Sequence, residues 1–294
     1  MADFTQNNSE IQHIINAIQY LPTLPNISAR LTDMIRSSTA STSDIARIVE
    51  LDPALASKML SIVNSAAFGV KKKIQSIQEA VTFLGTKTLS HLALSLSIIA
   101  TFKGTSDKRF NHAEFWTHSV AVAIFAREIA RVSRVSHQLD EIFTAGLLHD
   151  LGKIALDQFL TPFFKRVLDS IEKEPMPFYQ AEDKLFGINH ARIGEWVARN
   201  WELPLLTVVA IRHHHEKPDV RHGFNLSNDS TVDIIRIADW LAVTQNIGSS
   251  GSPVVENPGV DSFLRLSLTP EEADGIAREL HGDIASAVDS LGLK

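Results

Sequence analysis

The sequence contains no cysteine, which excludes disulfides and thiolate metal sites. It has no excess of basic residues, because 28 lysines and arginines face 34 aspartates and glutamates, and the formal net charge is -6. An acidic balance disfavours nucleic-acid binding. The most apolar stretch, residues 92–102, is interrupted by Ser95, Ser97 and Thr101 and is well short of the ~20 residues that span a bilayer. We therefore expect neither a nucleic-acid partner nor a membrane partner.

The amino-terminal residues give no sign of secretion. The first ten are polar and lack the basic start of a signal peptide. A length of 294 residues with 44% apolar residues is enough for one large globular domain or two modest ones. We expect a cytoplasmic protein.

Helical patterns dominate the sequence, and strand patterns are nearly absent. Ile11, Ile14, Ile15 and Ile18 repeat at helical spacing. Capping signals open further helices at residues 41–44, 52–53 and 269–272. Polar, glycine-containing breaks at 103–108 and 248–253 divide the chain into an N-terminal helical lobe (1–104), a helical core (105–247) and a C-terminal helical extension (248–294). These patterns predict an all-α, two-lobed helical bundle in which the N-terminal lobe packs on the core.

The pair His149-Asp150 is the first sign of chemistry. An apolar helix over 142–149 leads to it, and Gly152 is available for a left-handed turn after it. A neutral imidazole beside a carboxylate can begin a site for one or two divalent metals. Lys153 can neutralise phosphate oxygens or a bridging carboxylate. Further candidate ligands lie on four other predicted helical stretches: His118, His190, His214, His215 and Asp239.

Each candidate ligand also has an ordinary structural explanation. His118 fits a hydrogen-bonded core histidine, His190 a helix cap, and the run 213–215 a polar helix end. Asp239 lies in a helix that is apolar on nearly every side, where its alternative to a metal is a salt bridge to Arg236. Together the side chains form a nitrogen and oxygen ligand set, which favours iron first, with manganese, zinc or magnesium as alternatives.

The order of these ligands resembles the HD superfamily of metal-dependent phosphohydrolases, whose signature is His…His-Asp…Asp. The resemblance covers residues 110–246 and implies a first metal held by His118, His149, Asp150 and Asp239. The HD-GYP branch of that superfamily has additional histidines. By similarity, a second metal would be held by His190, His214 and His215, with Asp150 as the bridge. Glu114 occupies the position of a further glutamate ligand in some of those proteins, whereas His213 has no assigned role.

The chain departs from the HD-GYP branch after Glu216. The Gly-Tyr-Pro element that follows the His-His-Glu motif in that branch is missing here, where the sequence continues as residues 217–224. That element helps those relatives to recognise cyclic di-GMP. The substrate of the branch therefore does not carry over to this chain.

The N-terminal motifs resemble the HDOD domain, and the likeness runs from about residue 15 to 225. They include Leu-Pro-x-Leu-Pro at 21–25 and Asn-Ser-Ala-x-Phe-Gly at 64–69. HDOD domains are bacterial regulatory modules, usually regarded as HD relatives that have lost catalytic residues, yet this chain retains a nearly full ligand set. The resemblance implies a signalling protein with a dinuclear metal site that acts through protein partners. The alternative is an active phosphohydrolase or phosphodiesterase on a nucleotide or cyclic dinucleotide, with Asp150 and Lys153 as catalytic residues.

Overall fold

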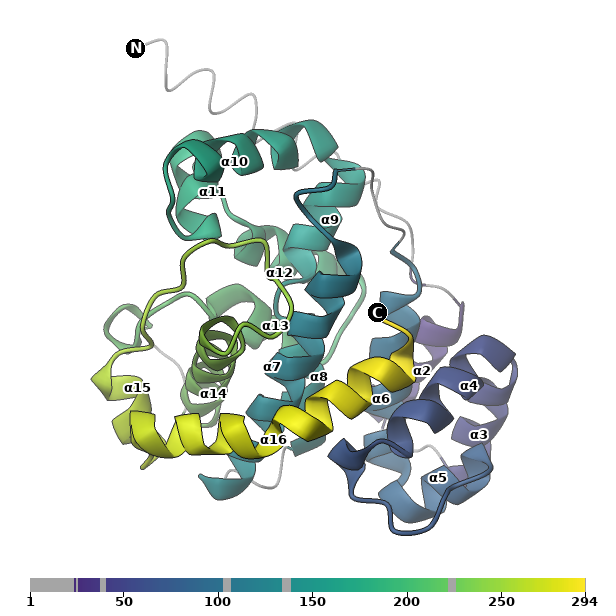
Figure 1. Cartoon of the computed structure of the whole chain (residues 1–294). Helices are drawn as coiled ribbons and strands as arrows, with labels where there is room; N and C mark the ends of the chain where they lie inside the picture. Colours follow the sequence, from purple (N-terminus) through teal and green to yellow (C-terminus); the bar gives the residue numbers. More distant parts are fainter. Residues whose placement is uncertain are drawn as a thin grey trace.

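In a computed structural model the protein is helical throughout the part that the structure describes (Figure 1). The described residues are 24, 26–37, 41–102, 107–133, 139–221 and 226–293. Their α-helices and 3₁₀-helices (η) are α2 (Asn26–Ser37), α3 (Thr42–Glu50), α4 (Pro53–Val63), η1 (Ala66–Phe68), α5 (Ile77–Leu84), α6 (Thr86–Ile99), α7 (His112–Val132), α8 (Leu139–Leu148), α9 (Leu151–Phe159), α10 (Thr161–Lys173), α11 (Phe178–Phe186), α12 (His190–Asn200), α13 (Leu205–His213), η3 (Pro218–Val220), α14 (Leu226–Thr244), α15 (Val260–Arg265) and α16 (Pro270–Leu291). The all-α prediction is confirmed. None of these helices is long and apolar enough to cross a membrane.

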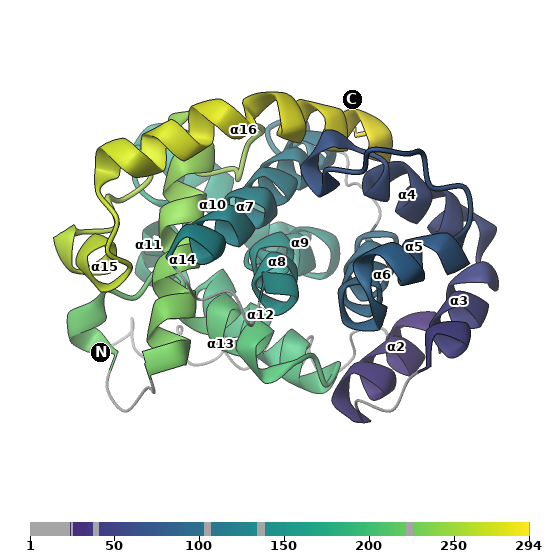
Figure 2. The same cartoon turned by 90° about the horizontal axis from the view of Figure 1, so that it is seen from below.

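The N-terminal lobe is built around α6, which contacts α2, α3, α4 and α5 (Figure 2). Every residue of α6 from 89 to 98 is buried. The side chain of Asn64 closes the loop that follows α4. Its amide donates to the carbonyls of Leu60 and Ile74, and its oxygen accepts from the N–H of Ile74, each at 2.8 Å. This asparagine of the Asn-Ser-Ala-x-Phe-Gly motif therefore has a structural role.

The second lobe gathers helices around the carboxyl end of α8. Helix α8 contacts α7, α13 and α14, and α9 packs on α12 (Figure 1). Helix α8 also contacts α6 of the N-terminal lobe. The helices that carry the predicted ligands thus converge on the junction between α8 and α9.

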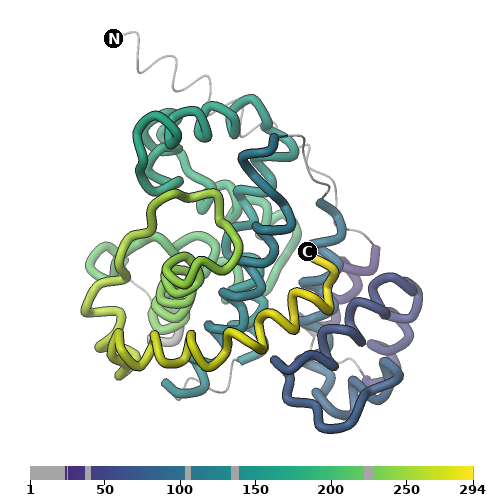
Figure 3. Tube along the Cα trace, viewed as in Figure 1, coloured from purple at the N-terminus to yellow at the C-terminus, as the bar shows by residue number. Residues whose placement is uncertain are grey.

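The C-terminal helix α16 joins the two lobes (Figure 3). It contacts α7 and α14 on one side and α4 and η1 on the other (Figure 2). A capping box between Thr269 and Glu272 begins it, as the sequence predicts. Part of the predicted C-terminal extension therefore packs across both lobes.

Most of the local helix signals are found where the sequence places them. Ser41 and Asp52 cap α3 and α4. The pattern of residues 155–172 predicts a single helix, but the structure has two, α9 and α10, because the backbone breaks at Leu160 (φ -131°) and Pro162 lies in the first turn of α10. The helix expected over 11–18 lies outside the described residues.

His91 lies at the contact between the lobes, on the side of α6 that faces α8. It is 1% exposed, and its Nδ1 lies 3.3 Å from Thr144 Oγ1. Burial lowers the pKa of His91 to about 4, although the nearby acids Glu141 and Asp140 act in the opposite direction. The folded protein therefore keeps His91 neutral at pH values where the unfolded chain binds a proton. This contact loses stability as the pH falls from about 6.5 towards 4.

We expect His91 alone to lower the free energy of unfolding by about 2 kcal/mol between about pH 7.5 and about pH 5. His91→Gln, which can keep a hydrogen bond to Thr144 but does not titrate, should remove that part of the pH dependence. Urea denaturation at the two pH values measures it. His281→Gln, on the exposed side of α16, is the control and should behave like the wild type. Equal pH dependence in the wild type and His91→Gln would contradict the assignment.

Candidate metal centre

The side chains predicted as ligands lie in two adjoining groups, and within each group the candidate ligand atoms are all within 4.8 Å of one another. The first group is His118, His149 and Asp239, and the second is Asp150, His190, His214 and His215. They come from α7, the α8–α9 junction, α12, the end of α13 and α14. All seven predicted positions are therefore brought together in space.

Asp150 lies between the two groups. Its Oδ2 is 3.4 Å from Nε2 of His149, while its Oδ1 is 3.1 Å from Nε2 of His190 and 3.5 Å from Nε2 of His214. The residue is only 2% exposed. One carboxylate thus presents an oxygen to each group, which is the arrangement that a bridging ligand requires.

Backbone carbonyls fix two of the imidazoles in the form that binds metal. Nδ1 of His149 donates to the carbonyl of Gly146 at 2.7 Å, and Nδ1 of His214 donates to that of Ile211 at 2.8 Å. In both cases the acceptor lies three residues earlier, at the end of the helix that delivers the histidine. Because the proton is on Nδ1, the Nε2 lone pair of each ring faces the cluster.

Glu182 on α11 orients a third ring, and sequence reasoning missed it. Its Oε2 accepts from Nδ1 of His190 at 2.5 Å and from the backbone N–H of the same residue at 2.9 Å. Glu182 is fully buried and lies four residues from both Phe178 and Phe186, which are buried too. The sequence signal that could have identified Glu182 is its position among the apolar residues on the buried face of a helix. The carboxylate–histidine pair is a common outer layer of metal sites.

The unsatisfied atoms of the cluster test whether a metal would fit. Nε2 of His149, Nε2 of His214 and Oδ1 of Asp150 are buried without a well-directed hydrogen bond, and so are both ring nitrogens of His118. Each such atom costs about 1–3 kcal/mol. Burial lowers the pKa of His214 to about 4, so its imidazole is neutral at pH 7. Divalent cations would satisfy the free lone pairs of His149, His214 and Asp150 and the one free lone pair of His118, so the residues present fit metal binding.

Asp239 faces the imidazoles and not the arginine on its own helix. Its Oδ1 lies 3.1 Å from Nε2 of His118 and 3.8 Å from Nε2 of His149. Burial alone would raise the pKa of Asp239, but the nearby ring of His118 lowers it to about 2. Arg236 donates to the carbonyls of His214 and Pro258. The alternative of an Arg236–Asp239 salt bridge is therefore wrong.

The two residues that follow Asp150 behave differently from each other. Lys153 is buried and its Nζ donates to Oδ2 of Asp150 at 2.7 Å, which places a cation against the shared carboxylate, as expected. The left-handed turn predicted at Gly152 is wrong, because Gly152 lies in the first turn of α9. Its role is close packing: a Cβ there would collide with the carbonyl of His190.

Two residues that the sequence left open lie outside both groups. Glu114 is exposed in the first turn of α7. Nδ1 of His213 lies 2.6 Å from Oε2 of Glu216, and Oε1 of the same glutamate accepts a hydrogen bond from Arg212. The Glu of the His-His-Glu motif therefore contacts the end of its own helix.

The residues of this candidate centre, apart from Asp239, lie in a region that matches a known protein family. The HDOD domain family matches residues 21–217, about two thirds of the chain. The chain belongs to the HDOD family. The match includes residues 21–104 of the N-terminal lobe and every candidate ligand except Asp239.

One sequence relative and several solved structures are similar to this chain. An uncharacterized protein of Treponema pallidum (strain Nichols) is 27% identical over 214 residues, which are 73% of this chain and 41% of that protein. This chain thus spans about two fifths of the length of that relative. An HDOD domain protein of unknown function from Geobacter sulfurreducens has a TM-score of 0.78 at 23% identity and covers 98% of each chain.

Two further crystal structures share the fold. A proposed phosphohydrolase from Shewanella amazonensis SB2B has a TM-score of 0.76 at 19% identity, with 95% of this chain and 97% of that chain covered. A proposed signal transduction protein from Marinobacter aquaeolei VT8 has a TM-score of 0.77 at 22% identity, with 98% and 66% covered. At these identities the likeness establishes the HDOD fold.

Gly152→Ala should destabilise the HDOD core by about 3 kcal/mol, because the new methyl group meets the His190 backbone and not a movable side chain. Gly282→Ala is the matched control. Gly282 lies in α16 with open space around the position of a Cβ, so the same change should stabilise the protein by about 0.5–1 kcal/mol. Urea denaturation of both variants measures the difference. Similar stabilities for the two would show that α9 and α12 do not approach as closely as described.

Proposed function

We propose that this HDOD protein is a bacterial, cytoplasmic regulatory protein with a dinuclear divalent-metal centre, and that it acts mainly through contacts with signalling proteins. The observation that carries the metal centre is the position of Asp150 against two groups of histidine and aspartate side chains whose candidate ligand atoms lie close together. HDOD membership supports the regulatory role. The relatives named above come from bacteria, which supports the setting.

The ligand roles follow the two groups. His118, His149 and Asp239 would hold one ion, and His190, His214 and His215 the other, with Asp150 shared. Nitrogen and oxygen donors suit iron, which we place first, and also manganese, zinc or magnesium. Lys153 would balance the charge of Asp150, and Glu182 would orient His190.

Access to the centre favours regulation over turnover. The cavity beside the ligands has a volume of about 30 Å³. This is room for about two water molecules and far less than a nucleotide needs. In this conformation the centre is therefore better suited to stabilising the core than to admitting a large substrate.

Protein purified without chelator should carry one to two equivalents of divalent metal per chain by elemental analysis, by our estimate from the two ligand groups. Glu182→Gln should weaken metal affinity by about 10–100-fold, because the amide cannot hold the His190 tautomer as the carboxylate does. Competition with a chromogenic chelator measures the change.

Glu174→Gln is the control for that experiment. Glu174 pairs with Lys184 on the surface, where both side chains are more than half exposed. The metal affinity of the Glu174→Gln variant should equal that of the wild type. A wild-type protein that contains no metal and takes none up would overturn the proposed function.

An active phosphohydrolase is the second candidate, and the position of Lys153 favours it. When bound, the metals would activate water and polarise a phosphate. Lys153 is held 2.7 Å from Asp150 and would stabilise negative charge that develops on a phosphate beside the shared carboxylate. Arg236 lines the same cavity and adds a second cation.

Hydrolysis of bis(p-nitrophenyl) phosphate by metal-loaded protein tests the second candidate. Asp150→Ala should abolish any activity, whereas His213→Ala, outside both ligand groups, should retain it. Absence of turnover in protein with a full metal complement would rule against hydrolysis of simple diesters. The regulatory function would then stand alone.

A further inference from the structure

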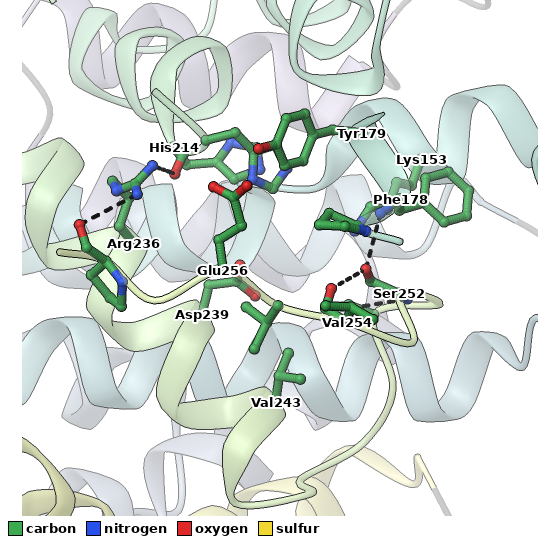
Figure 4. A pocket seen from close by; sticks show the side chains of 15 residues that line it. Lys153, Phe178, Tyr179, His214, Arg236, Asp239, Val243, Ser252, Val254 and Glu256 are labelled. Atoms are coloured by element: carbon green, nitrogen blue, oxygen red, sulfur yellow. Dashed lines mark hydrogen bonds between the residues drawn. The ribbon is translucent and has the colours of Figure 1, made fainter. Parts of the chain in front are cut away.

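The segment of residues 248–258, called here the covering segment, forms part of the wall of the cavity beside the candidate ligands His214, His215 and Asp239 (Figure 4). It is tied to three parts of the second lobe. The N–H of Ser249 donates to the carbonyl of Glu114, Oγ of Ser252 accepts from the N–H of Phe178, and the carbonyl of Pro258 accepts from Arg236. The break that the sequence predicts at residues 248–253 is therefore packed against the site.

The covering segment carries an acid into the cavity. Figure 4 shows Glu256 among the side chains that line it, which include Tyr179, Lys153 and Arg236. Oε1 of Glu256 accepts a hydrogen bond from Nε2 of Gln180 at 2.7 Å. The carboxylate is thus held on the same side of the cavity as α11 and beside the candidate ligands His214 and His215.

Arg236 is a buried cation without a direct anionic partner among the described residues. It is 6% exposed, and its guanidinium donates only to backbone carbonyls, those of His214 at 3.2 Å and Pro258 at 3.4 Å. Its Nε has no hydrogen-bond partner. A buried guanidinium is stable when an anion offsets its charge. Its Nε–H and its position on the cavity wall suit an acceptor oxygen that enters the cavity.

We propose that Arg236, Lys153 and Gln180 form a subsite for a phosphate group beside the metal centre, and that Glu256 is a tethered competitor for it. A phosphate-bearing ligand would enter when the covering segment releases Glu256 from Gln180. The subsite rests on the proposed function, because binding of a phosphate group beside the metal centre would be the signal that the protein passes to its partners. The side chains that form the subsite are not metal ligands. Occupation by Glu256 lowers the apparent affinity for a ligand by the fraction of molecules in which the subsite is closed.

The test is isothermal titration of the full chain, as purified, with inorganic phosphate. Glu256→Gln keeps the shape of the side chain and removes its charge, so it should bind phosphate about tenfold more tightly than the wild type. Asp261→Asn is the matched control, because Asp261 is an exposed acid in the first turn of α15, five residues away. It makes the same change in net charge and should bind like the wild type. A parallel titration with adenosine monophosphate distinguishes a free anion from a phosphate ester.

Equal phosphate affinity in Glu256→Gln and the wild type, or an equal gain in Asp261→Asn, would overturn the subsite. A gain confined to Glu256→Gln supports it, and the same gain for adenosine monophosphate extends it to esters. Metal content is measured on the same samples. If the protein contains metal and Glu256→Gln binds phosphate no more tightly than the wild type, the subsite is contradicted and the proposed function is not. If the protein contains no metal and Glu256→Gln binds phosphate more tightly, the subsite is supported and the proposed metal centre is contradicted.

Discussion

The buried charge of Asp150 is the constraint on which the second lobe depends. A carboxylate at 2% exposure is unfavourable by several kcal/mol unless cations and hydrogen bonds compensate it. Lys153 supplies one positive charge from the next turn of the chain. The remaining oxygen faces His190 and His214, whose rings are held by groups behind them. The ligands, the residues that orient them and the close packing of α9 on α12 are therefore parts of one arrangement.

This arrangement is connected to the rest of the molecule through two helices. Helix α8 delivers His149 to the centre and contacts α6 of the N-terminal lobe, where His91 meets Thr144. Helix α16 lies along α7 and reaches α4 and η1 (Figure 2). In the N-terminal lobe, the motif residue Asn64 has a structural role, because it closes the loop after α4. In the proposed function the N-terminal lobe offers a surface for protein partners, and the stability of that surface depends on the second lobe, on which it packs.

The covering segment offers an explanation for why a nearly complete set of metal ligands could occur in a protein whose proposed function is regulation. A centre with seven ligand side chains would be accessible to substrates if it were open. Here the covering segment lines the cavity beside the ligands and places Glu256 in it together with Lys153 and Arg236. Residues 248–258 lie beyond the part of the chain that matches the HDOD family, residues 21–217. Under the proposed function, the segment that limits access to the centre thus lies outside the part of the chain that defines the family.

The sequence by itself determined the helical class, several helix caps and the identity of the candidate ligands. Capping by Ser41 and Asp52 and the chain order of histidines and aspartates depend on neighbours a few residues apart, which a sequence pattern records. Only the tertiary structure decided that Glu182 lies behind His190 and that Glu256 enters the cavity. It also decided that Gly152 is required by the backbone of another helix and not by a turn. These contacts join residues whose distance is set by how helices pack, and helical periodicity says which face is buried but not what lies opposite it.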